Sequence, residues 1–407
     1  MTTAITDGAT LLEAYFDPAH RADPFPLLRQ IREASPLVLR GDDLVVVARY
    51  DDCRQVLRDP SVRNEPRLSR LGAAQPEQAR SLLFLDPPAH TRIRRLVSKA
   101  FTPRVVTGLV PRIRALTDAL IDALADRPDF DAVADFASPL PMQIICELLG
   151  IPVEDYHSFE PVAHRFGRGL DFDLIIPNPD LDDSQEAREF LFGYLRDLIA
   201  RRRREPGTDL LSRMIAVEEQ GDVLTEAELL ATSALLMGAG YDTTVNLISG
   251  SLLALLRDPA ALARLRAEPQ LATGIADEAL RFCSPAQFVM RTATEPLRVG
   301  DVDITPGTLV LCLLAAANRD PARYPDPDRF DLDRAPTDHV AFSAGIHFCI
   351  AAALARAEAA VAMTAFAERV VGPEIVAEPT WRDNINLRGL RSLPARHAGI
   401  VAPRIGH

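Results

Sequence analysis

The sequence predicts a mainly α-helical protein with a small β region, folded as a single domain over residues 1–407. Segments 104–126 and 186–204 repeat apolar residues every three or four positions, which is the spacing of amphipathic helices. Segments 37–50 and 297–314 are rich in β-branched residues and broken by Gly and Asp turns, as in a small sheet. Apolar residues make up 47% of the chain, so a large core can be buried. We expect roughly the first 20 residues to be loosely ordered, as chain termini often are.

The longest predicted helix begins after Thr225, which has Glu228 in capping-box spacing. It ends before Asp258-Pro259, because proline disfavours helix in the residue that precedes it. About 33 residues at about 1.5 Å each give a length of about 50 Å, enough to cross the molecule. The segment is apolar on nearly all sides, which predicts burial. Beyond it, the proline-rich stretch 320–334 predicts an irregular meander.

The middle of that helix carries Gly238, Gly240, Asp242, Thr243 and Thr244. Each glycine costs about 1 kcal/mol relative to alanine in a helix, and an unpaired buried carboxylate costs much more. One interpretation is close helix packing, with the acid paired to a distant arginine. The other is a local groove that holds a small ligand beside an acid and a hydroxyl. The residues alone leave both open.

Composition excludes several classes of function. The chain has 45 Lys and Arg against 57 Asp and Glu, a net charge of −12, which argues against nucleic acid as the main partner. The longest apolar run, Leu309 to Ala317, is about half of the roughly 20 residues that span a bilayer, so no membrane span is expected. The N-terminus lacks an export signal, which favours a cytoplasmic protein. The five cysteines are scattered without C-x-x-C, so neither a disulfide scaffold nor a structural zinc site is expected.

One cysteine, Cys349, stands between the loop "FSAGIHFC" and a strongly helix-forming stretch. A thiolate at a helix N-terminus gains from the helix dipole and unpaired N–H groups, which lower its pKa and suit it to bind a metal or attack a substrate. A nucleophile would need a general base, and His347 is two residues away. A buried structural cysteine is the remaining alternative.

The motifs "DPPAHTRIRR", "AGYDTT", "EALR" and "FSAGIHFC", in this order, resemble those of the bacterial cytochrome P450 family of heme-thiolate monooxygenases. The resemblance runs from about Pro24 to Pro394. It implies a single-domain cytochrome P450 fold, with heme b (iron protoporphyrin IX) between the long central helix and the loop of the cysteine ligand.

The resemblance also implies roles for the loop residues. Cys349 would be the axial thiolate of the heme iron, donating electron density that favours O–O cleavage. Phe342 would pack on the proximal side of the heme, Gly345 would allow a tight turn, and His347 would face a propionate. Ala351 stands where the family usually has glycine.

Other heme contacts follow from the same likeness. His90 and Arg94, at i and i+4 on one helical face, match the pair that the family uses on the heme carboxylates. Arg291 in "FVMRTA" is similar to the arginine that contacts a propionate from the β region. Ser343 replaces a common glycine of the cysteine loop.

The pair Glu278 and Arg281 in "EALR" is expected to be structural. In the family this pair is buried and is joined by an arginine of the meander, which here matches Arg329 in "PDRF".

The implied reaction inserts one oxygen atom of O2 into an organic substrate, by hydroxylation or epoxidation, and reduces the other atom to water. O2 would bind in the groove at Ala239–Gly240, and Asp242 and Thr243 would organise proton delivery. Electrons would come from a separate ferredoxin and ferredoxin reductase, because the chain has no dinucleotide or flavin fingerprint. A basic patch of Arg92, Arg95 and Lys99 would suit an acidic ferredoxin. A monomer is expected.

The substrate would be a hydrophobic small molecule such as a macrolide or other polyketide, a steroid or a terpenoid. By resemblance, the substrate pocket would include Leu82, Leu83, Leu235, Gly238, Ala286 and Gln287. Three competing hypotheses remain: a heme-dependent sensor without turnover, a peroxide-driven enzyme, and a cysteine hydrolase that uses Cys349 and His347.

Overall fold

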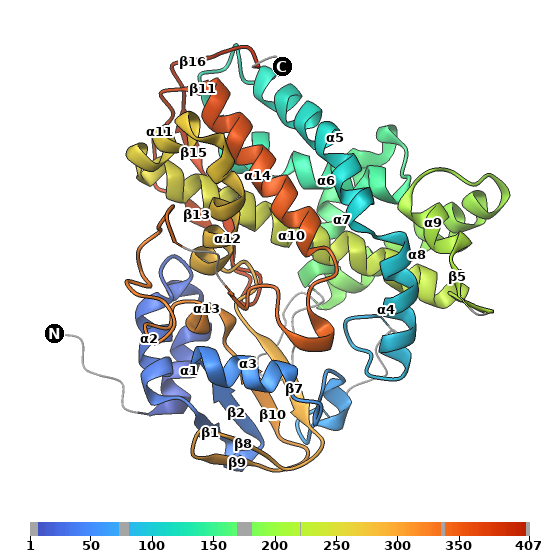
Figure 1. Ribbon diagram of the computed structural model, residues 1–407, viewed down its shortest axis with the longest axis vertical. Coiled ribbons are helices and arrows are strands. Elements are labelled where there is room, and N and C mark those ends of the chain that lie inside the picture. The colour runs from blue at the N-terminus through green and yellow to red at the C-terminus, as the bar shows by residue number, and fades with distance from the viewer. Residues whose placement is uncertain (1–6, 73–80, 169–180, 220, 335–337, 404–407) are drawn as a thin grey trace.

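The computed structural model describes residues 7–72, 81–168, 181–219, 221–334 and 338–403. Most helices gather in one half of the molecule, and the largest sheet lies in the other half with α1, α2 and α3 (Figure 1). The helices are α1 (Gly8–Phe16), α2 (Phe25–Ala34), α3 (Tyr50–Arg58), α4 (Ala89–Ala100), α5 (Pro103–Asp122), α6 (Pro139–Leu149), α7 (Tyr156–Arg168), α8 (Leu181–Arg204), α9 (Leu210–Ala216), α10 (Glu226–Arg257), α11 (Pro259–Ala267), α12 (Ala272–Cys283), α13 (Leu314–Ala317) and α14 (Ala352–Arg369).

The largest sheet has the strand order β1-β2-β10-β7-β3. Its strands are β1 (Leu37–Leu39), β2 (Leu44–Val47), β3 (Val62–Arg63), β7 (Val289–Ala293) and β10 (Leu309–Cys312). β10 runs parallel to β2 and antiparallel to β7, and Val310 pairs with both Val45 and Arg291. The register therefore places Arg291 on a central strand of the sheet. The small sheet predicted from the sequence is confirmed.

Short two- and three-residue strands complete the β structure. They are β4 (Asp129–Asp131), β5 (Glu218–Glu219), β6 (Asp222–Val223), β8 (Leu297–Val299), β9 (Val302–Ile304), β11 (Val370–Val371), β12 (Glu374–Ile375), β13 (Thr380–Trp381), β14 (Leu390–Ser392), β15 (Pro394–Arg396) and β16 (Gly399–Ile400). Most of the C-terminal strands were not predicted, because two residues carry no usable periodicity.

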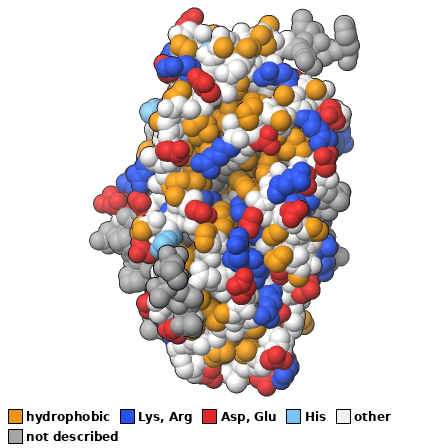
Figure 2. Space-filling model, turned by 90° about the vertical axis from the view of Figure 1, so that its left-hand side faces the viewer, with side chains coloured by type: hydrophobic (Ala, Val, Ile, Leu, Met, Phe, Trp, Pro, Cys, Tyr) orange, Lys and Arg blue, Asp and Glu red, His pale blue; other side chains and the backbone are white. Residues whose placement is uncertain are grey.

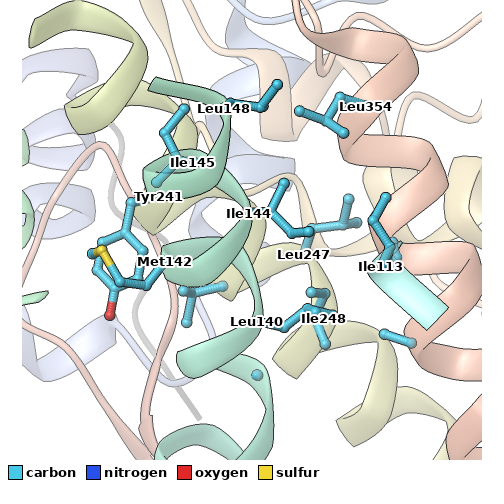
Figure 3. Packing of buried hydrophobic residues seen from close by; sticks show 14 of the residues in the cluster. Ile113, Leu140, Met142, Ile144, Ile145, Leu148, Tyr241, Leu247, Ile248 and Leu354 are labelled. Carbon is cyan, nitrogen blue, oxygen red and sulfur yellow. The ribbon is translucent and has the colours of Figure 1, made fainter. Parts of the chain in front are cut away.

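The long central helix is confirmed as α10. Its capping box is formed: the Thr225 side chain accepts from the Glu228 N–H, and the Glu228 carboxylate accepts from the Thr225 N–H at 2.9 Å. The helix ends at Arg257, directly before Asp258-Pro259. It packs against α6, α7, α12 and α14. Side chains of α6, α10 and α14, among them Ile144, Leu247 and Leu354, point toward one another in Figure 3. The main core lies along this helix.

The expectation of a loosely ordered N-terminus is wrong from Gly8 onward. Asp7 caps α1 by accepting from the N–H groups of Ala9 and Thr10. Leu11, Leu12, Tyr15 and Phe16 of this helix are all buried. These side chains pack in one cluster with α2 and the sheet, so burial of this apolar stripe orders the segment.

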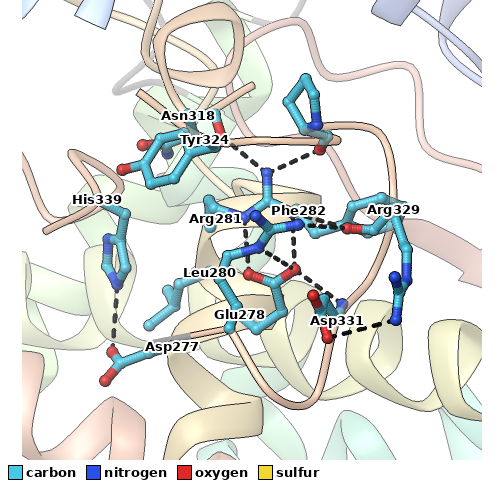
Figure 4. A network of polar contacts seen from close by, with 12 residues as sticks. Asp277, Glu278, Leu280, Arg281, Phe282, Asn318, Tyr324, Arg329, Asp331 and His339 are labelled. Carbon is cyan, nitrogen blue, oxygen red and sulfur yellow. Dashed lines mark hydrogen bonds and ion pairs between the residues drawn. The ribbon is translucent and has the colours of Figure 1, made fainter. Parts of the chain in front are cut away.

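The meander is irregular as predicted, and it closes over a buried ion pair (Figure 4). Arg281 and Glu278 are 0% and 2% exposed, and their side chains are joined by two hydrogen bonds of 2.7 Å. Arg281 also donates to the backbone carbonyls of Asn318, Pro327 and Arg329. One arginine therefore fixes α12 to three points of the chain beyond it.

The prediction that Arg329 completes this pair is wrong. The Arg329 side chain is 67% exposed and lies near Asp331, so only its carbonyl joins the network. Arg334 takes the place instead, with Nε 3.1 Å from Glu278 Oε1 and a side chain that is 10% exposed. Its guanidinium also donates to the carbonyl of Pro325, which holds the meander in its turn.

The face shown in Figure 2 has interspersed acidic and basic side chains around an apolar area. It offers no continuous basic surface of the kind that binds phosphate backbones. Among the described residues, one unbent helical segment, Ala132–Leu149, has the length and hydropathy of a membrane span, and 72% of it is buried inside the protein. The bent pair α10 and α11 passes the same test, at an angle of 108°.

Candidate active site

A cavity of about 300 Å³ lies between α10, α6, the strand β7, the cysteine loop and the start of α14. Its walls are mainly apolar. Of the residues singled out by the sequence, those that line it are Leu82, Leu83, Arg94, Leu235, Ala239, Gly240, Thr243, Thr244, Ala286, Arg291, Phe342, Ser343, His347, Cys349 and Ala351. Residues from opposite ends of the chain therefore meet around one space.

The cysteine loop is shaped by a turn at Gly345–His347. Gly345 has φ +68°, and a side chain there would collide with the backbone carbonyl of Leu57, so glycine is required. The Cys349 N–H donates to the Phe342 carbonyl at 3.0 Å, which closes the loop and turns the cysteine toward the cavity.

The pKa of the Cys349 thiol is shifted in the opposite direction to that expected at a helix N-terminus. Burial raises the pKa of the Cys349 thiol, and this outweighs the lowering by a hydrogen bond from Ala351 and by the charges of Arg94 and Arg356. The sequence argument gave too much weight to the dipole, because desolvation of a thiolate is the larger effect here. A bound metal cation would reverse the balance and hold the sulfur as thiolate.

The hydrolase hypothesis fails on this geometry. A nucleophilic thiol must give its proton to a neighbouring base. Among the residues that the structure describes, the Nε2 of His347 has no hydrogen-bond partner, and the Asp86 carboxylate lies 3.8 Å from it. With the pKa of Cys349 raised and that of His347 lowered by burial, both groups favour their neutral forms.

Two histidines meet beside the cavity, and one of them, His347, lines it. The rings of His90 and His347 are 4.3 Å apart between centroids and tilted by 45°. His90 is buried, and neither of its ring nitrogens has a hydrogen-bond partner among the described residues. Burial lowers the pKa of His90 to about 4. Unsatisfied buried ring nitrogens are costly, so this edge is built to receive a polar group.

Two arginines lie at the same cavity. Arg94 donates to the Phe348 carbonyl, and Arg291 donates to Asn64 at 2.7 Å and to the Ser343 hydroxyl at 3.3 Å. Burial lowers the pKa of both guanidinium groups. Neither is within ion-pair distance of a carboxylate among the pairs found in the described residues. Buried cations of this kind favour an anionic ligand.

The middle of α10 forms an open groove. The hydroxyl of Thr243 donates to the Ala239 carbonyl at 2.7 Å, and that of Thr244 donates to the Gly240 carbonyl at 2.8 Å. A methyl group placed on Gly240 would meet only Ile145, at 3.9 Å. The groove interpretation therefore holds at Ala239–Gly240.

The packing interpretation holds for the two neighbouring positions. Asp242 is 2% exposed and faces α7. Its carboxylate lies 3.0 Å from Nδ1 of His164 on that helix and 3.3 Å from Nη1 of Arg382, which directly follows β13. Gly238 is small because the ring of Phe166 lies directly over it. Both interpretations drawn from the sequence, the ligand groove and the close packing, therefore apply within this short part of α10.

Two of the expected substrate residues do not line this cavity. Gly238 does not line the cavity, since Phe166 occupies the space its side chain would take. Gln287 is buried elsewhere, with its amide directed to the carbonyl of Ser284. The sequence missed Pro141, Ile144 and Leu148 of α6, which do line the cavity. The available signal was that α6 is apolar except on the face of Gln143 and Glu147.

The basic patch on α4 is partly neutralised. Arg92 lies 2.8 Å from Asp222 and also pairs with Glu228. Arg95 lies 3.7 Å from the same Asp222. The β5–β6 hairpin therefore covers two of the three predicted basic residues with negative charge.

A buried acid, Glu358, lines the cavity from α14, and its Oε2 has no hydrogen-bond partner. Burial alone raises its pKa from 4.5 to about 8. The folded state thus binds this proton more tightly than the unfolded state, so stability is full below the unfolded pKa and is lost as pH rises toward 8.

We expect the free energy of unfolding to fall between pH 5 and pH 8 by about 3–4 kcal/mol more in the wild type than in the Glu358→Gln variant. Denaturant unfolding of both holoproteins across this range measures the difference. Identical pH dependence in the two proteins would show that Glu358 keeps an ordinary pKa.

The fold and cavity are those of a heme-thiolate monooxygenase: a cysteine loop faces a grooved central helix, and buried cations stand at the rim. The Cytochrome P450 family profile matches residues 35–369. The chain is 41% identical over 400 residues to Cytochrome P450 107B1 of Saccharopolyspora erythraea, covering 94% of this chain and 96% of that protein. It is 39% identical to the monooxygenase PikC of Streptomyces venezuelae, covering 92% and 91%. Ligand-free CYP164A2 of Mycobacterium smegmatis superimposes with a TM-score of 0.90 at 44% identity, covering 95% and 99%.

The chain therefore belongs to the cytochrome P450 family. It is a monooxygenase, an oxidoreductase that incorporates one oxygen atom and binds heme b. This rules out a sensor without turnover. The residues at and beside the cavity fit the cofactor: the ring nitrogens of His90, the half-buried Arg94 and the buried Arg291 suit its two carboxylates, and the sulfur of Cys349 suits its iron.

Proposed function

We propose that Cys349 is the thiolate ligand of heme b in an O2-dependent monooxygenase. The supporting observation is that its loop, the Thr243 groove and a rim of buried cations line one cavity. Phe342 and Gly345 would shape the loop.

On the same proposal, four residues would hold the heme carboxylates: His90, Arg94, Arg291 and His347. The spectrum of the reduced protein with carbon monoxide tests the ligand. A strongly red-shifted Soret band is expected, and an unshifted band would contradict it.

The bound heme would supply oxygen activation, and the thiolate ligand would favour O–O cleavage. The chain's own residues would do the rest. The groove at Ala239–Gly240 leaves room for a diatomic molecule, and the apolar walls exclude bulk water. Asp242 would hold a proton beside the groove, and the hydroxyl of Thr243 would present it to the cavity. A dry site needs such a fixed proton source, because protons otherwise arrive only with water.

The Thr243→Ala variant should keep the heme spectrum but release more peroxide and form less product per NAD(P)H consumed. Loss of one positioned proton donor typically costs about 100-fold in the step it serves. Product and peroxide are measured together with an added ferredoxin system. Unchanged coupling would remove Thr243 from this role, and Ser251→Ala, on the same helix but bonded to the Leu247 carbonyl, serves as control.

The proposed substrate is a hydrophobic small molecule, hydroxylated or epoxidised at a macrolide, steroid or terpenoid skeleton. The pocket residues in support are Leu82, Leu83, Leu235 and Ala286. Relatives include 6-deoxyerythronolide B hydroxylase, Mycinamicin IV hydroxylase/epoxidase and Vitamin D(3) 25-hydroxylase, 35%, 38% and 36% identical. A screen for low-to-high spin shifts with macrolides and sterols would identify the class. No shift with either skeleton would contradict the assignment.

Electrons would come from a separate ferredoxin and its reductase, to a cytoplasmic, monomeric, single-domain enzyme spanning residues 1–407. Since Asp222 already pairs with Arg92, we expect only a weak dependence of turnover on salt from the α4 patch. Peroxide-driven turnover without ferredoxin, at an equal rate, would favour the peroxide-dependent alternative.

A further inference from the structure

Asp242 is connected to solvent through α7. His164 of that helix places Nδ1 3.0 Å from Asp242 Oδ2 and 3.3 Å from Oδ1. The Asp242 side chain is 3% exposed, whereas that of His164 is 29% exposed. One imidazole therefore touches a carboxylate that water cannot reach and is itself in contact with water.

A third group, Arg382, contacts both His164 and Asp242 and so allows two protonation states of His164 Nδ1. Arg382, directly after β13, places Nη1 2.7 Å from His164 Nδ1 and 3.3 Å from Asp242 Oδ1. A guanidinium only donates, so in that contact Nδ1 must be the unprotonated acceptor. In the contact with Asp242, the same Nδ1 must carry the proton and donate it. The two arrangements differ by one proton and need no large movement.

The neighbouring charged and polar groups have partners of their own, so His164, Asp242 and Arg382 form this site together. On α7, Arg165 turns back to the Pro161 carbonyl, and Glu160 accepts from Tyr241 of α10. Tyr241 also contacts Ser138 at the start of α6. Glu160 and Tyr241 thus form a second, separate contact between α7 and α10, one helical turn from His164.

We propose that His164 is the solvent-side group that passes protons to Asp242, with Arg382 as its positioning residue. In the step, the neutral His164 ring loses its proton at Nδ1, an O–H bond forms on the Asp242 carboxylate, and Nε2 takes a proton from a hydronium ion of the solvent, which leaves water. No electron moves. Histidine suits this task because its proton exchanges near neutral pH. The inference rests on the proposed role of Asp242 and Thr243, and it adds the route by which they are resupplied.

The competing explanation is a purely structural contact, in which Arg382 and His164 tie three elements together. The His164→Gln variant separates the two, because glutamine keeps hydrogen bonding but does not ionise. We expect an intact carbon monoxide spectrum, about tenfold less product per NAD(P)H, a larger solvent isotope effect in D2O, and partial recovery with added imidazole. His157→Gln, at an exposed position of the same helix, should match the wild type.

A second measurement needs no turnover. Nitrogen NMR of histidine-labelled protein, in the diamagnetic ferrous carbon monoxide form, should show Nδ1 of one histidine titrating and shifting in Asp242→Asn. A His164 signal that stays constant with pH, or normal coupling in His164→Gln and His164→Asn, would overturn the proposal. If Thr243→Ala still uncouples in that case, the proposed function stands; if neither variant uncouples, the proposed function fails as well.

Discussion

Replacing Cys349 by alanine should remove the red-shifted Soret band of the reduced carbon monoxide complex and lower turnover by at least about 100-fold. Changing a mere partner of a metal ligand typically costs 10- to 100-fold, so removing the sulfur itself must cost more. The residues around the cavity rim are untouched by this change, so some heme should still be retained. The absorbance spectrum and product formation are measured on the same sample.

The matched control is Cys283→Ala. Cys283 is also a free cysteine whose thiol has a raised pKa, but it lies on α12 against Gly250, away from the cavity. Its replacement should leave both the spectrum and the rate unchanged. A normal carbon monoxide spectrum in Cys349→Ala would show that another residue holds the iron and would remove the basis of the proposed function.

The second large effect is expected at the buried ion pair. Arg281→Ala should lower the free energy of unfolding by about 3–5 kcal/mol, because it leaves the Glu278 carboxylate buried without its main partner. It also removes the donors to the carbonyls of Asn318 and Pro327. Denaturant unfolding of the holoprotein measures the loss, and the fraction of protein that retains heme should fall with it.

Two arginines of the meander provide a matched pair of variants that test the same network. Arg334→Ala should cost about 2–4 kcal/mol, since Glu278 again loses a buried partner. Arg329→Ala should cost less than about 0.5 kcal/mol, because the side chain is mostly exposed and its carbonyl remains. Equal losses, or a larger loss at Arg329, would mean that the assignment made from the sequence was the right one.

Elements with strong local signals were predictable. The capping box at Thr225 and the proline after Asp258 fix both ends of α10, because both depend on residues a few positions apart. For these two ends the physical cause lies within a few residues of its effect. The turn at Gly345, in contrast, was implied by the family resemblance, and the Leu57 carbonyl that excludes a side chain there is distant in sequence.

Contacts set by distant parts of the chain were not predictable. His164 and Arg382 lie 78 and 140 residues from Asp242, and nothing in the sequence pairs them. In the meander, the match to the family motif indicated Arg329, and no periodicity shows that Arg334 is the arginine that turns inward. The lack of a side chain at Gly238 was interpreted as space for a ligand, although the ring of Phe166 from α7 fills that space.

The ring of Phe166 packs against Gly238, and this contact limits how the enzyme could acquire new substrates. Any side chain introduced at 238 strikes that ring, so enlargement there would first have to move the side chain of Phe166. Leu82, Leu83 and Ala286 lie on connecting segments outside the helices and face the same cavity. Mutant libraries aimed at altered selectivity should therefore concentrate on these three positions and leave 238 untouched.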